Sequence, residues 1–352
     1  MRTCYLHIGA PKAGSTTIQG FLGVYRDALK ARGLDAPDFG CGEIVTGALA
    51  LSGGLRSERK ARKPKTWAWR WLDRHIDRTS DDLVVSREGL CNHLSDAGPN
   101  AFAREFFRQR GVRLTLIAYV RDHVGYLNAA YAQQAKKLRT TYSFDNWLIG
   151  ALSGGRYNYW RRFKPLLDDP EVDFSIESLH RLGDGGLLPD FCAKVGLPGF
   201  DSSGFDASPF RNATPGPKAI AAGVLVGRGL KELGIDPDFD QSLHRRFRLA
   251  VEERGWDEKP FFGPDETRIA RILDSFAGGD EKLAQAAWGV SWEEAAPATR
   301  RPRNVFDLGA APAAEVREVE ELAREVLATA QKPARGWRRL FTKVQPVDPI
   351  SP

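Results

Sequence analysis

Short apolar runs alternate with segments of helical periodicity along the first half of the chain. Three runs predict buried strands, because each is continuously apolar and ends in polar or glycine-containing sequence: Cys4–Ile8, Leu83–Ser86 and Leu114–Val120. Apolar residues between the runs recur every three or four positions, as on one face of a helix. This alternation predicts an α/β fold, a parallel sheet flanked by helices, in which ligands bind beyond the carboxyl ends of the strands.

Helical spacing is clearest directly after the first strand. Apolar side chains from Ile18 to Leu29 fall on one face of a helix that Ser15–Thr17 opens: Ile18, Phe21, Leu22, Tyr25 and Leu29. The same reading predicts further helices at Trp67–Ile76, from Gly125 to about Lys137, within 218–255 and 266–288, and at Glu315–Gln331, with one more strand at Val172–Ser175.

The 352 residues are enough for one enlarged α/β domain with a C-terminal appendage. We expect the domain to span 1–294, with helical additions and an insertion at 55–78, and to be followed by a linker and helix at 295–331. Residues 332–352 are rich in proline and are expected to be disordered. No apolar stretch approaches the length of a membrane span. The first strand begins so early that no room remains for a signal peptide, so we expect a cytoplasmic location.

The loop after the first strand carries the clearest chemical motif. It runs Gly9-Ala10-Pro11-Lys12-Ala13-Gly14-Ser15-Thr16-Thr17. This sequence keeps the Gly-x-x-x-x-Gly frame of a Walker A loop, but Ser15 stands where that motif has lysine, and the cation is Lys12, inside the loop. Small residues that open directly into a helix present backbone N–H groups and the positive end of the helix to an anion. The sequence therefore predicts a phosphate-binding loop.

Charge and cysteine content fit an anionic ligand and no metal. The net charge is +6 and the pI is about 9.1, which favours anionic partners. The cysteines are widely scattered and have no histidine at a metal-ligand spacing: Cys4, Cys41, Cys91 and Cys192. We therefore expect reduced thiols and no bound metal.

The lysine inside the loop resembles the 5′-phosphosulfate loop of sulfotransferases that use 3′-phosphoadenosine 5′-phosphosulfate (PAPS), and His7 to Gln19 is similar to the bacterial carbohydrate-type branch. The resemblance implies a P-loop NTPase-like sulfotransferase fold and transfer of a sulfuryl group from PAPS, without a metal. It implies a hydroxyl, or an amine, of a carbohydrate or glycolipid as the acceptor. The loop residues 9–17 would bind PAPS, and Lys12 would stabilise the leaving phosphate.

The family's second phosphate site corresponds to the end of the strand Leu114–Val120. In sulfotransferases this strand ends in an arginine and a serine lies eight residues on, and both hold the 3′-phosphate. Arg121 matches the arginine, but Ala129 stands at the serine position, so Asn128 is the replacement donor that we consider. The loop 211–218, which begins with Arg211, resembles a segment that closes over the donor in this branch. Turn chemistry explains that loop equally well.

Glu88 is the candidate general base, because the strand Leu83–Ser86 delivers it to the same edge of the sheet. A first-turn glutamate that complements a helix dipole is the structural alternative. Three histidines are rival bases: His7, His93 and His123. His7 lies within a strand, which is typical of a packed core histidine.

Two other functional classes remain open. A metal-dependent nucleotide or small-molecule kinase would use the same loop, but Arg121 separates Asp122 from the apolar strand that a Mg²⁺-binding acid should follow. A non-catalytic binder of polyanions or nucleic acid would use the insertion 55–78, where basic residues interleave with Trp67, Trp69 and Trp71. No nucleic-acid-binding fold accompanies that segment, so we expect no nucleic-acid partner. The tail 332–343 leaves peripheral contact with an anionic membrane open. Oligomeric state is not indicated.

Overall fold

The structure is a computed structural model of the whole chain and describes residues 1–38, 67–183, 185–207 and 214–330. Three predictions lie outside these residues: the basic part of the insertion at 55–66, the loop residue Arg211, and the tail 332–352.

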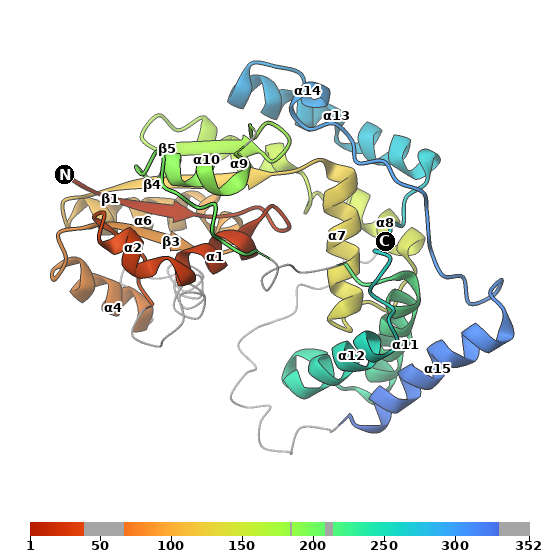
Figure 1. Cartoon of the computed structure of the whole chain (residues 1–352). Coiled ribbons are helices and arrows are strands. Elements are labelled where there is room, and N and C mark those ends of the chain that lie inside the picture. Colours follow the sequence, from red (N-terminus) through yellow and green to blue (C-terminus); the bar gives the residue numbers. More distant parts are fainter. Residues whose placement is uncertain (39–66, 184, 208–213, 331–352) are drawn as a thin grey trace. The chain divides into compact units, whose positions relative to one another are not determined.

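The centre of the fold is a five-stranded sheet in which every neighbouring pair of strands is parallel (Figure 1). The order across the sheet is β2-β3-β1-β4-β5. The strands are β1 (Arg2–His7), β2 (Leu34–Asp35), β3 (Asp82–Ser86), β4 (Val112–Val120) and β5 (Asp173–Ser178). The predicted α/β class and parallel sheet are confirmed. The strand β2, with two residues, is too short to leave a pattern in the sequence.

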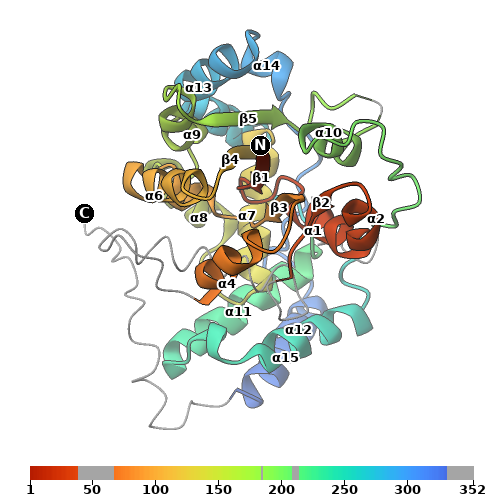
Figure 2. The same ribbon diagram turned by 90° about the vertical axis from the view of Figure 1, so that its left-hand side faces the viewer.

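Helices cover both faces of this sheet. Figure 2 shows α1, α2 and α10 along one face and α6 and α9 along the other. Ile18, Phe21 and Leu22 of α1 are fully buried, which confirms the predicted apolar face. The helices here are α1 (Ser15–Val24), α2 (Arg26–Lys30), α4 (Trp67–Ile76), α5 (Cys91–Leu94), α6 (Ala97–Arg108), α9 (Tyr159–Leu167), α10 (Leu187–Lys194), α13 (Glu266–Trp288) and α14 (Trp292–Ala295).

The contacts divide the chain into two compact units. The first comprises Met1–Leu127, Ala151–Asn212 and Pro264–Arg300, and the second Asn128–Gly150, Ala213–Gly263 and Arg301–Pro352. The division falls within α7 (His123–Lys136) and within α8 (Phe144–Ser153). Each unit includes residues from before and from after position 294, the expected end of the α/β domain.

The second unit is helical in its described part. It contains α11 (Pro217–Leu233), the short 3₁₀ helix η2 (Pro237–Phe239), α12 (Gln241–Glu253) and α15 (Ala313–Ala328). Apolar side chains of α11, α12 and α15 form its core, among them Val226, Phe247 and Leu322. Two glycines of α11 lie against backbone: a Cβ on Gly223 or on Gly227 would come within 2.5 Å of a carbonyl oxygen. Close packing of α11 therefore requires glycine at these two positions.

None of the helices in the described parts of the chain combines the length with the apolar character that a membrane span requires.

Candidate functional site

The loop between β1 and α1 has an unusual backbone. Gly9, Lys12 and Gly14 all have positive φ, at 34°, 69° and 85°. Lysine rarely adopts this left-handed region, because its Cβ approaches the backbone, and such residues cluster at ligand-binding sites. Gly14 is also the N-cap of α1, and no side chain within the described parts of the chain caps this helix end. Left-handed residues in a loop that opens a helix form the concave arrangement of N–H groups that binds anions.

Hydrogen bonds join the turn after β3 to this loop. They bring Glu88, the predicted base, beside the loop. Arg87 N–H donates to the His7 carbonyl (3.0 Å), Gly89 N–H to Gly9 (3.3 Å), and Cys91 N–H to Ile8 (3.1 Å). The Cys91 thiol also donates to the Gly9 carbonyl (3.2 Å), and burial raises the pKa of this thiol to about 11. Glu88 lies within the fastened turn, so the structure places it beside the loop, as the sequence predicted.

The His7 and Ser15 side chains both lie beside Gly9. A Cβ on Gly9 would come within 2.6 Å of Ser15 Oγ and 3.5 Å of His7 Nε2. Both atoms are buried and neither has a hydrogen-bond partner among the described residues. His7 Nδ1 pairs with Ser86 Oγ at 2.7 Å, and burial lowers the pKa of His7 to about 3. His7 is therefore a neutral core side chain and a weak base at pH 7, whereas Ser15 offers a hydroxyl at the start of α1.

Gly14 is required both by its backbone angle and by its neighbour, because a Cβ there would overlap Cδ2 of Leu187 at the start of α10. Gly14→Ala is expected to lower the free energy of unfolding by about 1–2 kcal/mol, the cost of a left-handed L-residue. Gly23→Ala in α1 is the matched control. Open space surrounds Gly23, and alanine there should raise stability by about 0.5–1 kcal/mol. Urea denaturation measures the change in the free energy of unfolding for each variant. Changes of the same sign would contradict the requirement for glycine at position 14.

Arg121 follows β4 and lies over the first turn of α7. A Cβ on Gly125 would overlap Nη2 of Arg121, so a side chain at residue 125 would displace the guanidinium from this position. Arg121 Nε is buried without a hydrogen-bond partner among the described residues, and it is 3.8 Å from Oδ2 of Asp122. A guanidinium at the carboxyl end of a strand beside β1 is suited to a phosphate.

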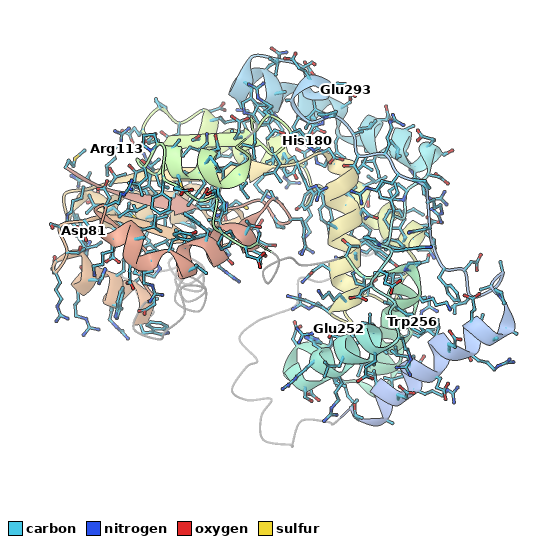
Figure 3. All side chains as sticks on the ribbon, in the orientation of Figure 1. Asp81, Arg113, His180, Glu252, Trp256 and Glu293 are labelled. Atoms are coloured by element: carbon cyan, nitrogen blue, oxygen red, sulfur yellow. The ribbon has the colours of Figure 1, made fainter. Side chains whose placement is uncertain are left out.

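Asp122, by contrast, has a structural role, because it connects α7 to the distant residue Thr299. Its carboxylate accepts hydrogen bonds from Gly125 N–H (2.7 Å) and from both N–H (3.0 Å) and Oγ1 (2.7 Å) of Thr299. His180, labelled in Figure 3, is 3.3 Å away. Burial acts to raise the pKa of Asp122, but these hydrogen bonds outweigh it and lower the pKa to about 2.

Asp122 should therefore stabilise the fold at neutral pH and lose this effect in acid. Its folded pKa is below the unfolded value near 3.8, so its contribution is present above pH 4 and falls as pH approaches 2. The stability difference between the protein and Asp122→Asn should shrink by about 1 kcal/mol from pH 5 to pH 3. Urea denaturation at each pH measures it, with Asp81→Asn as a control for the loss of one charge. A difference that is constant with pH would contradict this role.

His123 is also structural. It is fully buried and stacks on Phe276, with ring centroids 3.9 Å apart. Its Nδ1 pairs with Oδ2 of Asp280 at 2.7 Å, and its Nε2 donates to the Tyr157 carbonyl at 2.9 Å. Both ring nitrogens are thus engaged, which leaves none to accept a proton from a substrate. Burial raises the pKa of Asp280, and the facing imidazole opposes the rise.

Asn128, the donor considered for the 3′-phosphate, belongs to the second unit. Its side chain is 8% exposed, and the amide donates to the Phe261 carbonyl (3.0 Å) and accepts from Gly263 N–H (2.9 Å). These hydrogen bonds give Asn128 a structural role in holding residues 261–263. Among the residues that the structure describes, we find no side chain in place of the serine that Ala129 replaces.

Two further arginines near the loop were not predicted as site residues. Arg87 is half-buried, and its Nε has no hydrogen-bond partner among the described residues; burial lowers its pKa and the Glu88 charge opposes this. Arg162 of α9 interacts electrostatically with Cys91 and Tyr126, and its Nη2 donates to the Arg156 carbonyl (2.5 Å). Helical spacing could have indicated Arg162, because it falls on the buried face of α9.

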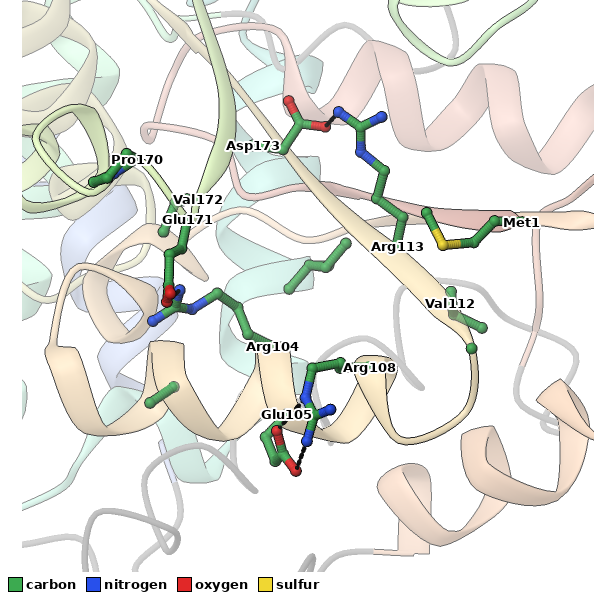
Figure 4. A pocket seen from close by; sticks show the side chains of 13 residues that line it. Met1, Arg104, Glu105, Arg108, Val112, Arg113, Pro170, Glu171, Val172 and Asp173 are labelled. Atoms are coloured by element: carbon green, nitrogen blue, oxygen red, sulfur yellow. Dashed lines mark hydrogen bonds and ion pairs between the residues drawn. The ribbon is translucent and has the colours of Figure 1, made fainter.

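A cavity of about 1010 Å³ lies at the opposite end of the strands, where β4 and β5 begin beside α6 (Figure 4). Its charges are already paired: Arg104 with Glu171 (2.8 Å), Arg108 with Glu105 (2.7 Å), and Arg113 with Asp173 (2.8 Å). Ligands of parallel sheets bind at the carboxyl ends of strands. We therefore place the candidate site at the β1–α1 loop and not at this cavity.

Comparisons with protein-family models, with curated proteins and with solved structures each gave no match. Any function assigned to this chain must therefore be argued from its residues and their geometry.

Proposed function

We propose that this chain is a PAPS-dependent sulfotransferase with a P-loop NTPase-like fold. The observation that carries the proposal is the β1–α1 loop, in which Lys12 has a left-handed backbone between Gly9 and Gly14 and leads directly into α1. A cation inside the loop, rather than after its second glycine, suits a phosphosulfate, which carries less charge than a triphosphate.

Buried donors that follow two neighbouring strands, β1 and β4, would suit the two ends of the nucleotide. The loop amides and the hydroxyls of Ser15, Thr16 and Thr17 would bind the 5′-phosphosulfate, and Ser15 Oγ is a buried hydroxyl with no other partner among the described residues. Arg121 would bind the 3′-phosphate, and its buried Nε supports this assignment. A buried donor costs free energy unless it finds an acceptor, which an anionic ligand supplies.

The proposed reaction is an in-line displacement at sulfur. An acceptor hydroxyl oxygen forms a bond to sulfur while the bond between sulfur and the 5′-phosphate oxygen breaks. The acceptor proton passes to the Glu88 carboxylate, and the products are a sulfate ester and 3′-phosphoadenosine 5′-phosphate. Lys12 stabilises the negative charge that develops on the leaving phosphate. A carbohydrate or glycolipid hydroxyl is the proposed acceptor.

A metal-dependent kinase is the second candidate, because its nucleotide would use the same loop. The position of Asp122 disfavours it. This carboxylate, the nearest acid after β4, is occupied by backbone and side-chain donors at Gly125 and Thr299. Binding of Mg²⁺ there would require breaking these hydrogen bonds.

Thermal unfolding with two nucleotides distinguishes these functions. At 100 times the dissociation constant, a ligand stabilises the folded state by about 2.7 kcal/mol. We expect 3′-phosphoadenosine 5′-phosphate to raise the melting temperature by several degrees, and adenosine 5′-monophosphate, which lacks the 3′-phosphate, to raise it less. A larger effect of ATP with Mg²⁺ would favour the kinase. Stabilisation by heparin alone, lost at high salt, would favour a polyanion-binding protein.

A further inference from the structure

We propose that the second unit contains a separate binding site for a small amphipathic carboxylate, a molecule with an apolar body and one acidic head. The site is a cavity of about 510 Å³ formed by α7, the start of α8, α11 and the segment 303–308. Cavities of roughly 300–1,000 Å³ with apolar walls and a few polar groups are typical of small-molecule sites. Every residue that lines it belongs to the second unit.

Aromatic side chains pack beneath the lining of this cavity. Tyr131 packs edge-on against Phe144, with ring centroids 5.3 Å apart, and lies 5.6 Å from the Phe261 ring. Each of these three residues is only 2% exposed, so they support the lining. The partly exposed apolar residues of the lining come from the segment 303–308: Val305, Phe306 and Leu308. Such a surface favours an apolar ligand body, because its burial removes hydrocarbon from water.

Hydrogen bonds fix this lining in place. The Asn304 side chain accepts from Phe262 N–H (2.6 Å) and donates to the Pro260 carbonyl (2.9 Å). Asn128 holds the same segment from α7, through Phe261 and Gly263. A preformed lining lowers the ordering cost of binding.

Two arginines and two aspartates line the cavity: Arg228, Arg303, Asp145 and Asp307. Asp307 accepts a hydrogen bond from Gly309 N–H (2.8 Å), and Arg228 is the cation that faces a ligand without a paired carboxylate in the described part of the chain. Arg303 pairs with Asp145 through two contacts of 3.1 and 3.2 Å, so these charges neutralise each other. Arg228 is exposed and donates through Nε to the Thr141 carbonyl (2.8 Å), and it forms no ion pair with any described acidic residue. Its charge opposes the rise that burial causes in the pKa of Tyr131, so the guanidinium lies near the cavity. An acidic head group complements it.

Isothermal titration of the full chain with decanoate, decanol and decylamine tests this proposal. We expect decanoate to bind and decanol to bind about 10–100-fold more weakly, the difference that a hydrogen bond to a charged group provides. Decylamine should bind most weakly, since its charge repels Arg228. Equal affinity for decanoate and decanol would overturn the proposed head group, and no binding of decanoate would overturn the site.

Three variants locate the binding. Arg228→Gln should reduce decanoate affinity to the level of decanol and leave decanol unchanged, whereas Arg248→Gln, on the exposed part of α12, should change neither. Val224→Phe should abolish binding of both ligands, because Val224 lines the cavity and a phenyl ring would fill it. Circular dichroism and urea denaturation check that each variant folds. If Val224→Phe does not fold, Arg228→Gln still decides, and undiminished decanoate binding in it would overturn the proposal.

Discussion

Lys12→Gly should lower the rate of sulfuryl transfer by about 10²–10³-fold while leaving the folded protein equally or more stable. Under the proposed function the rate falls because the variant lacks the ammonium that we assign to stabilising the leaving phosphate, an effect of the size measured for single electrostatic groups in active sites. Stability should not fall, because glycine adopts the left-handed backbone of residue 12 without the steric cost that lysine has. Single-turnover sulfation assays and urea denaturation measure the two effects.

Two companion variants separate charge from backbone at this position. Lys12→Ala removes the charge but keeps the steric cost, so it should be as inactive as the glycine variant and less stable. Lys12→Arg keeps a positive charge and should retain more activity than either. Full activity in Lys12→Gly would remove the lysine from the mechanism. Lost stability in that variant would show that the interactions of its side chain outweigh the backbone cost.

Glu88→Gln should lower the rate of transfer by about 10²–10⁴-fold, the usual contribution of a general base. Glutamine keeps the size and polarity of the side chain but cannot accept the acceptor's proton at neutral pH. Binding of 3′-phosphoadenosine 5′-phosphate should be nearly unchanged, because no phosphate contact is assigned to Glu88. Acceptor turnover and product affinity, measured on the same preparation, give both quantities.

Glu105→Gln is the matched control for this substitution. Glu105 is an exposed glutamate of α6 that pairs with Arg108 (2.7 Å), far along the chain from the loop and not among the proposed site residues. Its loss should leave turnover unchanged. Normal turnover in Glu88→Gln would exclude Glu88 as the base. Equal losses of turnover and of nucleotide affinity would indicate that Glu88 supports the loop instead.

The sheet could be predicted because β3 and the second half of β4 are continuously buried. Continuous apolar runs identify β3 and β4, and the confirmed parallel pairing follows from the helices between them. The helix α6 was missed, because its first residues Ala-Gly-Pro-Asn resemble a turn. Proline is tolerated in the first turn of a helix, where its missing N–H has no partner to lose, so Pro99 begins a helix here.

The site could be predicted only in part, for a physical reason. A loop between a strand and a helix is contiguous in sequence, so the β1–α1 loop is readable as a motif. The role of Asn128 depends on partners far away in the chain. Asn128 bonds to Phe261 and Gly263, more than 130 residues on, and no local pattern encodes such pairing. The apolar spacing from Ile18 to Leu29 predicted one helix that continues through Tyr25, whereas the structure has two helices there, α1 and α2.

The two glycines of α11 that lie against carbonyl oxygens have a consequence for engineering this protein. Replacing helical glycines by alanine is a common route to thermostable variants. At Gly223 and Gly227 the added methyl group would collide with the carbonyls of Ala135 and Thr140, and rigid backbone cannot yield as a side chain does. Gly278 of α13, which has open space around it, is the better choice. The same substitution thus has opposite outcomes on two helices of one chain.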